Sequence, residues 1–182
     1  MAGFPRPWFV SGGWAIDLFV GRVTREHEDL EVGLFRRDQG ALWAYLSGWE
    51  LCKAQSDQAG GGWVPWHEGE WLELPIHQIR ARREGGEPPE FEFFLNDMAG
   101  EDWLCRRNTA ITRPVAEISR RSSSGIPFIV PEIQLLYKAK WHREKDEHDF
   151  QTALSLMSAA QRAWLKAGLE VIHPGDAWLA VL

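Results

Sequence analysis

The sequence predicts an α+β fold, with a mixed β-sheet flanked by helices and a helical C-terminal segment. Three observations support this: a strand, a glycine turn and a helix follow one another near the N-terminus, the middle is rich in strands, and the chain becomes helical after Pro131. With 182 residues, 45% of them apolar, we expect one structural domain. Within it we distinguish a core at residues 1–130 and a helical segment at residues 131–182 that packs on the core.

Strands and helices alternate in the first third of the chain. Gly21 ends the first helix, and acidic and apolar residues alternate with a period of two over 29–35. The expected elements are a strand ending at Phe9-Val10, a turn at Ser11–Gly13, a helix at 14–20, a strand at 29–35, a helix at 39–46 and a strand at 49–54.

Glycine and proline punctuate the middle of the chain, where we expect antiparallel strands at 77–83 and 90–95. Helices are expected at 133–141, 144–157 and 159–172. The second has apolar residues at helical spacing, and the third opens with the capping pattern Ser158-Ala-Ala-Gln161.

Composition excludes several functional classes. The formal net charge is −6, which disfavours nucleic acid as a partner. No uncharged apolar run approaches the roughly 18 residues of a membrane span, and the first residues lack the layout of a signal peptide, so we expect a cytoplasmic protein without membrane contact. Cys52 and Cys105 match neither a zinc-ligand spacing nor a disulfide framework. Oligomeric state stays open.

Asp29 and Glu31 lie two positions apart on an expected strand, so their side chains share one face. Carboxylate oxygens suit a hard cation such as Mg²⁺, which can hold a phosphoryl group during displacement. Alone, such a pair more often marks only a solvent-facing strand. The turn at Ser11, Gly12 and Gly13 adds backbone N–H groups at the start of a helix, where an anionic phosphate is stabilised.

At this point the chain resembles the aminoglycoside and lincosamide nucleotidyltransferases of the DNA polymerase β-like superfamily. The resemblance covers most of the chain, and its residues are 12–17 (GGWAID), 21–32 (GRVTREHEDLEV), 131–140 (PEIQLLYKAK) and 145–150 (KDEHDF). It implies a nucleotidyltransferase fold. It also implies that Asp29 and Glu31 bind the metal and that Gly12 and Gly13 approach a nucleoside triphosphate. Glu31 is a departure, since many members have Asp there.

The superfamily also uses a third carboxylate, as metal ligand or as general base, on a later strand. We assign Glu92 to this catalytic and metal-binding position, with Glu90 as its immediate competitor and a solvated edge-strand acid as the alternative reading. For the nucleotide we expect Ser11, Arg25 and Lys138 to contact phosphate beside the glycines, whereas Asp17 and His27 organise the loop by hydrogen bonding.

The resemblance implies an enzyme of antibiotic-resistance type. Such an enzyme would use Mg²⁺ to transfer a nucleoside monophosphate to a hydroxyl of a small polyhydroxylated acceptor such as an aminoglycoside. The group transferred would be AMP from ATP, or the corresponding monophosphate from another nucleoside triphosphate. Two alternatives stay open. One is a non-catalytic protein of this fold that binds a nucleotide or a protein partner, and the other is a toxin-like enzyme that modifies tRNA or protein.

The eleven tryptophans and the negative net charge predict an aromatic, partly acidic acceptor cleft between sheet and C-terminal helices. Its candidate residues are Trp63, Trp66, Trp71, Trp103 and Trp141. The basic pairs Arg82-Arg83, Arg106-Arg107 and Arg120-Arg121 are most simply solvated strand ends. If they converge, they could bind an acidic or RNA substrate.

Overall fold

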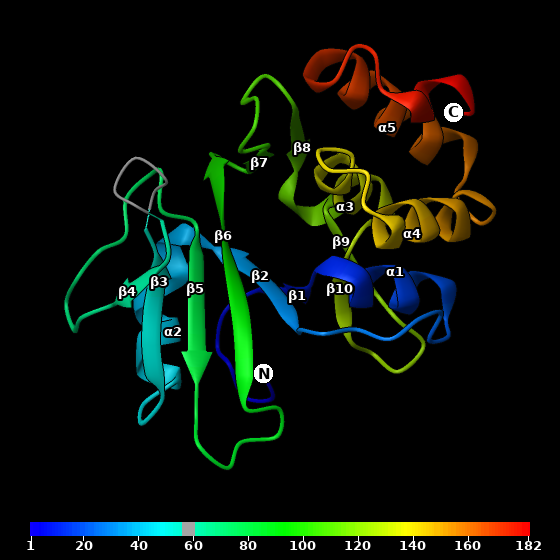
Figure 1. Cartoon of the computed structure of the whole chain (residues 1–182). Helices are drawn as coiled ribbons and strands as arrows, with labels where there is room; N and C mark the ends of the chain where they lie inside the picture. Colours follow the sequence, from blue (N-terminus) through cyan, green and yellow to red (C-terminus); the bar gives the residue numbers. More distant parts are fainter. Residues whose placement is uncertain (56–60) are drawn as a thin grey trace.

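The computed structural model describes residues 1–55 and 61–182. Within these residues, ten strands form one mixed sheet (Figure 1). The strands are β1 (Trp8–Val10), β2 (Glu31–Phe35), β3 (Glu50–Ala54), β4 (Trp63–Pro65), β5 (Gln78–Arg82), β6 (Glu90–Ala99), β7 (Asp102–Leu104), β8 (Thr112–Pro114), β9 (Ser119–Arg121) and β10 (Pro127–Ile129). The α-helices are α1 (Gly12–Val20), α2 (Gln39–Tyr45), α3 (Pro131–Lys138), α4 (Glu144–Leu154) and α5 (Ala159–Ile172).

The centre of the sheet is built from segments that lie far apart in the sequence. The strand order is β4-β3-β5-β6-β2-β1-β10-β9, and β7 pairs with both β6 and β8. β2 runs parallel to β6, with Glu31 opposite Glu92, and antiparallel to β1. β5 runs antiparallel to β6. This register brings the acids of two distant segments to one place on the sheet.

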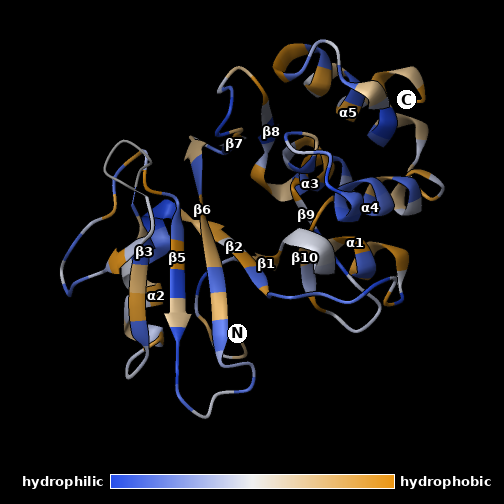
Figure 2. Ribbon diagram, viewed as in Figure 1, coloured by the Kyte–Doolittle hydropathy of each residue, from blue (hydrophilic) through white to orange (hydrophobic). Residues whose placement is uncertain are grey.

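Side chains that alternate along β2 and β6 divide the interior into two cores. One face carries Val32, Leu34, Phe93 and Leu95, which pack with Leu42 of α2 in one core. The second core joins β1 and β10 to α1 and to the C-terminal helices. Hydrophilic and hydrophobic residues both appear along β6 in Figure 2. The opposite face of β2 and β6 carries the acids Glu31 and Glu92 together with Asn96, Phe35 and Phe94.

The helical segment after β10 begins at Pro131, the first residue of α3, where proline needs no N–H partner. α3 contacts α1, α4 and α5, and α4 also contacts α1. Ser158 and Gln161 form the expected capping box of α5. These helices lie beside the β1–β10 side of the sheet in Figure 1.

The α+β class, the mixed sheet and the antiparallel pair β5–β6 confirm the sequence-based expectation. Several boundaries differ. α1 begins at Gly12, so the glycines form its first turn. β2 begins at Glu31, which leaves Asp29 just before the strand. The short strands β4, β7, β8, β9 and β10 were not predicted, because three residues show no period. Among the described residues, no helix has both the length and the apolarity that a membrane span requires.

Candidate active site

Three carboxylates from β6 and the β2 segment converge at the centre of the sheet. Carboxylate oxygens of Asp29, Glu31 and Glu92 all lie within 4.8 Å of one another. The parallel register places Glu31 beside Glu92, and the N–H of Glu92 donates to the carbonyl of Leu30 at 3.1 Å. Asp29 is exposed, whereas the other two acids are partly buried. The structure therefore brings together the three acids that the sequence assigned to metal binding.

The charge of Glu31 is poorly compensated. Burial, reinforced by the neighbouring charges of Asp29 and Glu92, raises the pKa of Glu31 to about 7, although Lys138 acts in the opposite direction. The carboxylate lies against Gly12, where a Cβ atom would stand 2.1 Å from Glu31 Oε2. Gly12 also has a positive φ of 68°. Only glycine therefore allows this acid to lie over the start of α1.

Glu92 is held by two side chains of β5. Gln78 Nε2 donates to Glu92 Oε2 at 2.7 Å, and Arg80 Nη2 lies 3.6 Å from Glu92 Oε1. The guanidinium of Arg80 in turn lies 3.9 Å from the ring centroid of Trp63. Glu90 instead forms ion pairs with Arg80 and Arg82. Of the two competing acids, Glu92 is thus the one that lies beside Asp29 and Glu31.

The start of α1 is less open than the glycine turn suggested. The N–H of Gly12 donates to Gln134 Oε1 at 2.8 Å, a contact with α3. At Gly13, a Cβ atom would stand 2.2 Å from Arg25 Nη2 and 2.5 Å from His27 Nδ1. The two glycines thus admit protein side chains against the helix. Ser11 lines the cavity described below.

The loop between α1 and Asp29 is fixed by Asp17. Its carboxylate accepts hydrogen bonds from Thr24 N at 3.1 Å and from Thr24 Oγ1 at 2.5 Å, and its other oxygen lies 2.5 Å from His27 Nε2. The ring of His27 also packs on Trp14, at 4.4 Å between centroids. This is the organising role that the sequence suggested for Asp17 and His27.

Arg25 and Lys138, which we expected to contact phosphate, both bind carboxylates of α4. Arg25 donates from Nε and Nη2 to the two oxygens of Asp149, at 2.8 and 2.9 Å. Lys138 Nζ lies 2.8 Å from Asp149 and 3.1 Å from Asp146. Burial alone would raise the pKa of Asp149, but the hydrogen bond from Arg25 and the charge of Lys138 hold it below its ordinary value. The two cations therefore tie the loop and α3 to α4.

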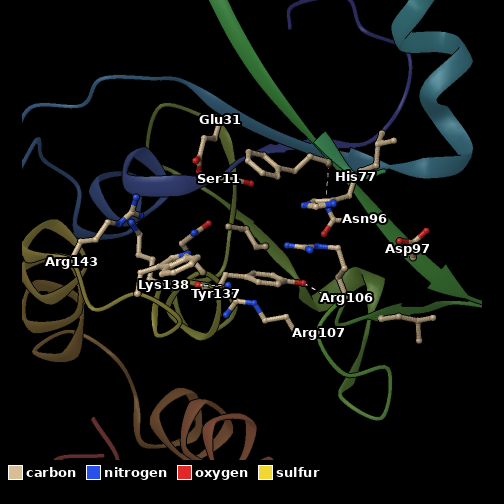
Figure 3. Close-up of a pocket in the computed structure, with 16 residues that line it drawn as sticks. Ser11, Glu31, His77, Asn96, Asp97, Arg106, Arg107, Tyr137, Lys138 and Arg143 are labelled. Atoms are coloured by element: carbon tan, nitrogen blue, oxygen red, sulfur yellow. Dashed lines mark hydrogen bonds between the residues drawn. The ribbon is translucent and has the colours of Figure 1, made fainter. Parts of the chain in front are cut away.

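A cavity of about 230 Å³ lies next to Glu31, between the sheet and α3 (Figure 3). Its aromatic residues are Phe94, Tyr137 and Trp141. Its charged residues are Glu31, Asp97, Arg106, Arg107, Lys138 and Arg143. The lining thus carries more cations than acids.

This lining corrects the expectation of a tryptophan-walled, partly acidic cleft. Trp66 and Trp103 are buried in the two cores, and Trp63 packs under Arg80. Of the five candidate tryptophans, only Trp141 lines this cavity. Tryptophan usage failed as a guide because the large ring fills a core as readily as a cleft.

Arg107 is partly buried and lines the cavity, whereas Arg106 lines it at an exposed position just after β7, so the expectation of solvated strand ends holds only in part. Arg143, which also lines the cavity, was not singled out from the sequence. Nε of Arg143 donates to Asp146 at 2.8 Å, and the acids Glu31 and Asp29 help to raise the pKa of this guanidinium. No local sequence pattern distinguishes it, because its place depends on how α4 packs.

Part of the chain is similar to a known protein family. Residues 2–85 match the family model described as aminoglycoside-2''-adenylyltransferase. No curated protein sequence matches the chain.

Three solved structures have a similar fold. The lincomycin-bound lincosamide antibiotic adenylyltransferase LnuA has 18% identity and a TM-score of 0.55, and the match covers 83% of this chain and 87% of that one. The solution structure of the antibiotic-resistance factor ANT(2'')-Ia has 18% identity and a TM-score of 0.57, with 91% and 83% covered. The crystal structure of ANT(2'')-Ia in complex with adenylyl-2''-tobramycin has 17% identity and a TM-score of 0.55, with 91% and 88% covered.

At these identities, the structural likeness establishes the nucleotidyltransferase fold, and the family model adds the sequence relationship over residues 2–85. Glu31 and Glu92 lie on the strands expected from the sequence, and Asp29 lies just before β2. Residues 2–85 are thus similar to the aminoglycoside-2''-adenylyltransferase family, and the chain has the nucleotidyltransferase fold of the lincosamide and aminoglycoside adenylyltransferases.

Proposed function

We propose that this protein transfers AMP from ATP, in the presence of Mg²⁺, to a hydroxyl of a small polyhydroxylated acceptor. The observation that carries the proposal is the convergence of Asp29, Glu31 and Glu92 beside the N-terminus of α1 and next to a cavity. Acids that only face solvent would not be partly buried beside one another, as Glu31 and Glu92 are. Such crowding costs free energy unless a cation shares the site.

The donor set fits a divalent cation of the Mg²⁺ type. All three side chains offer carboxylate oxygens, which hard cations prefer, and burial together with the charges of Asp29 and Glu92 makes the ionised form of Glu31 costly without a cation. Asp29, Glu31 and Glu92 would hold the ion. When bound, such an ion neutralises the negative charge of the reacting phosphate groups.

The remaining chemistry is assigned to side chains around the acids. The acceptor oxygen forms a bond to the α-phosphorus of ATP, the bond from that phosphorus to the bridging oxygen breaks, and pyrophosphate leaves. Glu92 accepts the proton of the acceptor hydroxyl, and Gln78 orients its carboxylate through the hydrogen bond to Oε2. Ser11 and the start of α1, with Arg143 and Lys138 close by, favour the phosphates at this end of the cavity.

A small-molecule acceptor is supported by two of the structural neighbours. One neighbour holds lincomycin and another holds an adenylylated tobramycin. The family model over residues 2–85 points to the same class of reaction. The space beside Glu31 is a cavity with aromatic walls, which suits a compact molecule with hydroxyl groups.

The experiment that tests this proposal is the binding of ATP with and without Mg²⁺, measured by isothermal titration calorimetry. Asp29→Asn removes one ligand charge at an exposed position, so the fold should be retained. We expect ATP to bind the parent only with Mg²⁺ and the variant to lose most of that affinity. Asp102→Asn, at an exposed position of β7, is the matched control. If Asp29→Asn binds Mg²⁺–ATP as tightly as the parent, the metal assignment fails.

A further inference from the structure

Most charged groups of the cavity are already satisfied by other parts of the protein. Lys138 and Arg143 are paired with acids of α4, and both guanidinium ends of Arg107 donate to carbonyl oxygens at the end of α3. Asp97 accepts two hydrogen bonds from Arg36, which is itself buried. Lys138, Arg143 and Asp97 are thus balanced by ion pairs within the protein, whereas the hydrogen bonds of Arg107 go to neutral carbonyl groups.

Arg106 is different. Among the described residues, its guanidinium makes no hydrogen bond or ion pair, although the side chain lines the cavity. Its backbone is nevertheless well anchored. The N–H of Arg106 donates to the hydroxyl of Tyr137 at 3.3 Å, and the preceding residue, Cys105, is fully buried. Arg107 follows with its two hydrogen bonds to α3.

The carboxylate at this end of the cavity, Asp97, is already ion-paired with Arg36, and the other side chains around Arg106 carry no negative charge. His77 lines the same part of the cavity, and its Nδ1 faces the carbonyl of Pro75 at 2.9 Å. Burial, aided by the charge of Arg106, lowers the pKa of His77, so its ring is neutral at pH 7. The amide of Asn96 is used by the carbonyls of Leu34 and Phe94 and by the indole of Trp103.

The position of Arg106 separates it from the proposed phosphate end of the cavity. In Figure 3, Glu31, Arg143 and Lys138 lie toward one end, whereas Arg106, His77 and Asn96 lie toward the other, with the guanidinium of Arg106 pointing into the space between. At the first end, Lys138 and Arg143, both ion-paired with α4, and the N-terminus of α1 lie near the proposed position of the ATP phosphates. The guanidinium of Arg106, which is exposed and unpaired among the described residues, lies away from that end and is free to bind another group.

We propose that Arg106 binds an anionic group, a carboxylate or a phosphate, on the acceptor molecule. The inference rests on the proposed function and narrows its acceptor class. A guanidinium binds such groups with paired, charge-assisted hydrogen bonds, and it repels ammonium groups. The acceptor of this protein is accordingly an anionic or acidic sugar-like molecule, and polyamine acceptors such as aminoglycosides bind poorly in this cavity.

The test uses four sugars that share one ring and differ in charge: glucuronate, glucose 6-phosphate, glucose and glucosamine. Each is titrated onto the protein with Mg²⁺ and α,β-methylene-ATP, and binding is measured by ligand-observed NMR. We expect both anionic sugars to bind about tenfold more tightly than glucose, the size of one hydrogen-bonded charge contact, and glucosamine to bind most weakly. Arg106→Gln should abolish this order, and Arg106→Glu should favour glucosamine.

Arg120→Gln is the matched control, because Arg120 is an exposed arginine of β9 outside the cavity. Arg120→Gln should bind the four sugars with the same order of affinities as the parent. The affinity for α,β-methylene-ATP, measured in parallel, should be the same in all four proteins. If Arg106→Gln weakens nucleotide binding and leaves the sugar order unchanged, Arg106 serves the triphosphate and the proposal is wrong. Equal binding of all four sugars, no binding of the anionic ones or a preference of the parent for glucosamine also overturns it.

These failures are distinguishable from a failure of the proposed function. If the parent protein does not bind the nucleotide analogue with Mg²⁺, the proposed reaction itself is refuted, whatever the sugars do. If the nucleotide binds and the sugar order is absent, the reaction stands and only the acceptor class is overturned.

Discussion

Replacing Glu31 with glutamine should stabilise the metal-free protein at alkaline pH, although the change removes a proposed metal ligand. The folded protein holds this carboxyl at a pKa of about 7, against an ordinary value of 4.5. Burial and the charges of Asp29 and Glu92 cause the difference. Glutamine has almost the same shape and no charge, so it can lie over Gly12 without the electrostatic cost.

The magnitude follows from the two pKa values. The folded state binds the proton more tightly than the unfolded state, so the stability contribution of Glu31 is complete below pH 4.5 and falls as the pH rises through 7. One pKa unit corresponds to about 1.4 kcal/mol, which makes the full loss about 3 kcal/mol. Since Glu31 is only partly buried, solvent screening reduces this to about 2 kcal/mol.

Thermal unfolding in EDTA at pH 5 and pH 8.5 measures this effect. For a chain of this length, about 2 kcal/mol shifts the Tm by roughly 4–8 °C. Glu31→Gln should exceed the parent by that amount at pH 8.5 and by much less at pH 5. With excess Mg²⁺ and ATP, the gap should close or reverse, because only the parent binds the ion. Glu101→Gln, an exposed control, should follow the parent. An identical pH dependence of parent and Glu31→Gln would refute the reasoning.

Two further substitutions probe the scaffold. Gly12→Ala should cost more stability in urea unfolding than Gly100→Ala, since both have positive φ but only at Gly12 would a Cβ meet Glu31, at 2.1 Å. The left-handed backbone alone costs about 1–2 kcal/mol, so equal losses for the two variants would count against the close contact. Asp149→Asn leaves Arg25 and Lys138 without their shared carboxylate and should cost about 3 kcal/mol. Asp102→Asn is its exposed control. If Asp149→Asn loses no more stability than Asp102→Asn, this network contributes little to stability.

The sequence predicted the helices and the central strands well because each carries a strong local signal. α5 spans the expected residues, with its capping box, and β6 shows the expected alternation. The shorter strands at the sheet margin carry no such signal. Their pairing depends on contacts across the chain, such as β1 with β10, which are more than 100 residues apart.

The site was predictable where its chemistry lies in short motifs. Asp29 and Glu31 form such a motif, and Glu92 follows from an acid on an apolar strand, although only the register between β2 and β6 separates it from Glu90. The cations were harder to predict. Arg25 and Lys138 bind Asp149, which the sequence did not connect to them, because the contact requires α4 to pack on α1 and α3.

The cavity was the least predictable part. Its residues come from α3, from the end of β6 and from the segment after β7, and no single stretch of sequence shows that these meet. Arg106 and Arg107 look like a solvated pair in the sequence, yet their placement follows from Tyr137 and from the end of α3.

The transfer of label from ATP to an acceptor tests the central claim most directly. The protein is incubated with Mg²⁺ and ATP that carries radioactive phosphorus at either the α or the γ position, with a panel of aminoglycosides, lincosamides and acidic sugars. The account predicts that only the α-label enters an acceptor product, with release of pyrophosphate, and that Asp29→Asn abolishes the transfer. Transfer of the γ-label, or α-label transfer that persists in Asp29→Asn, would contradict it.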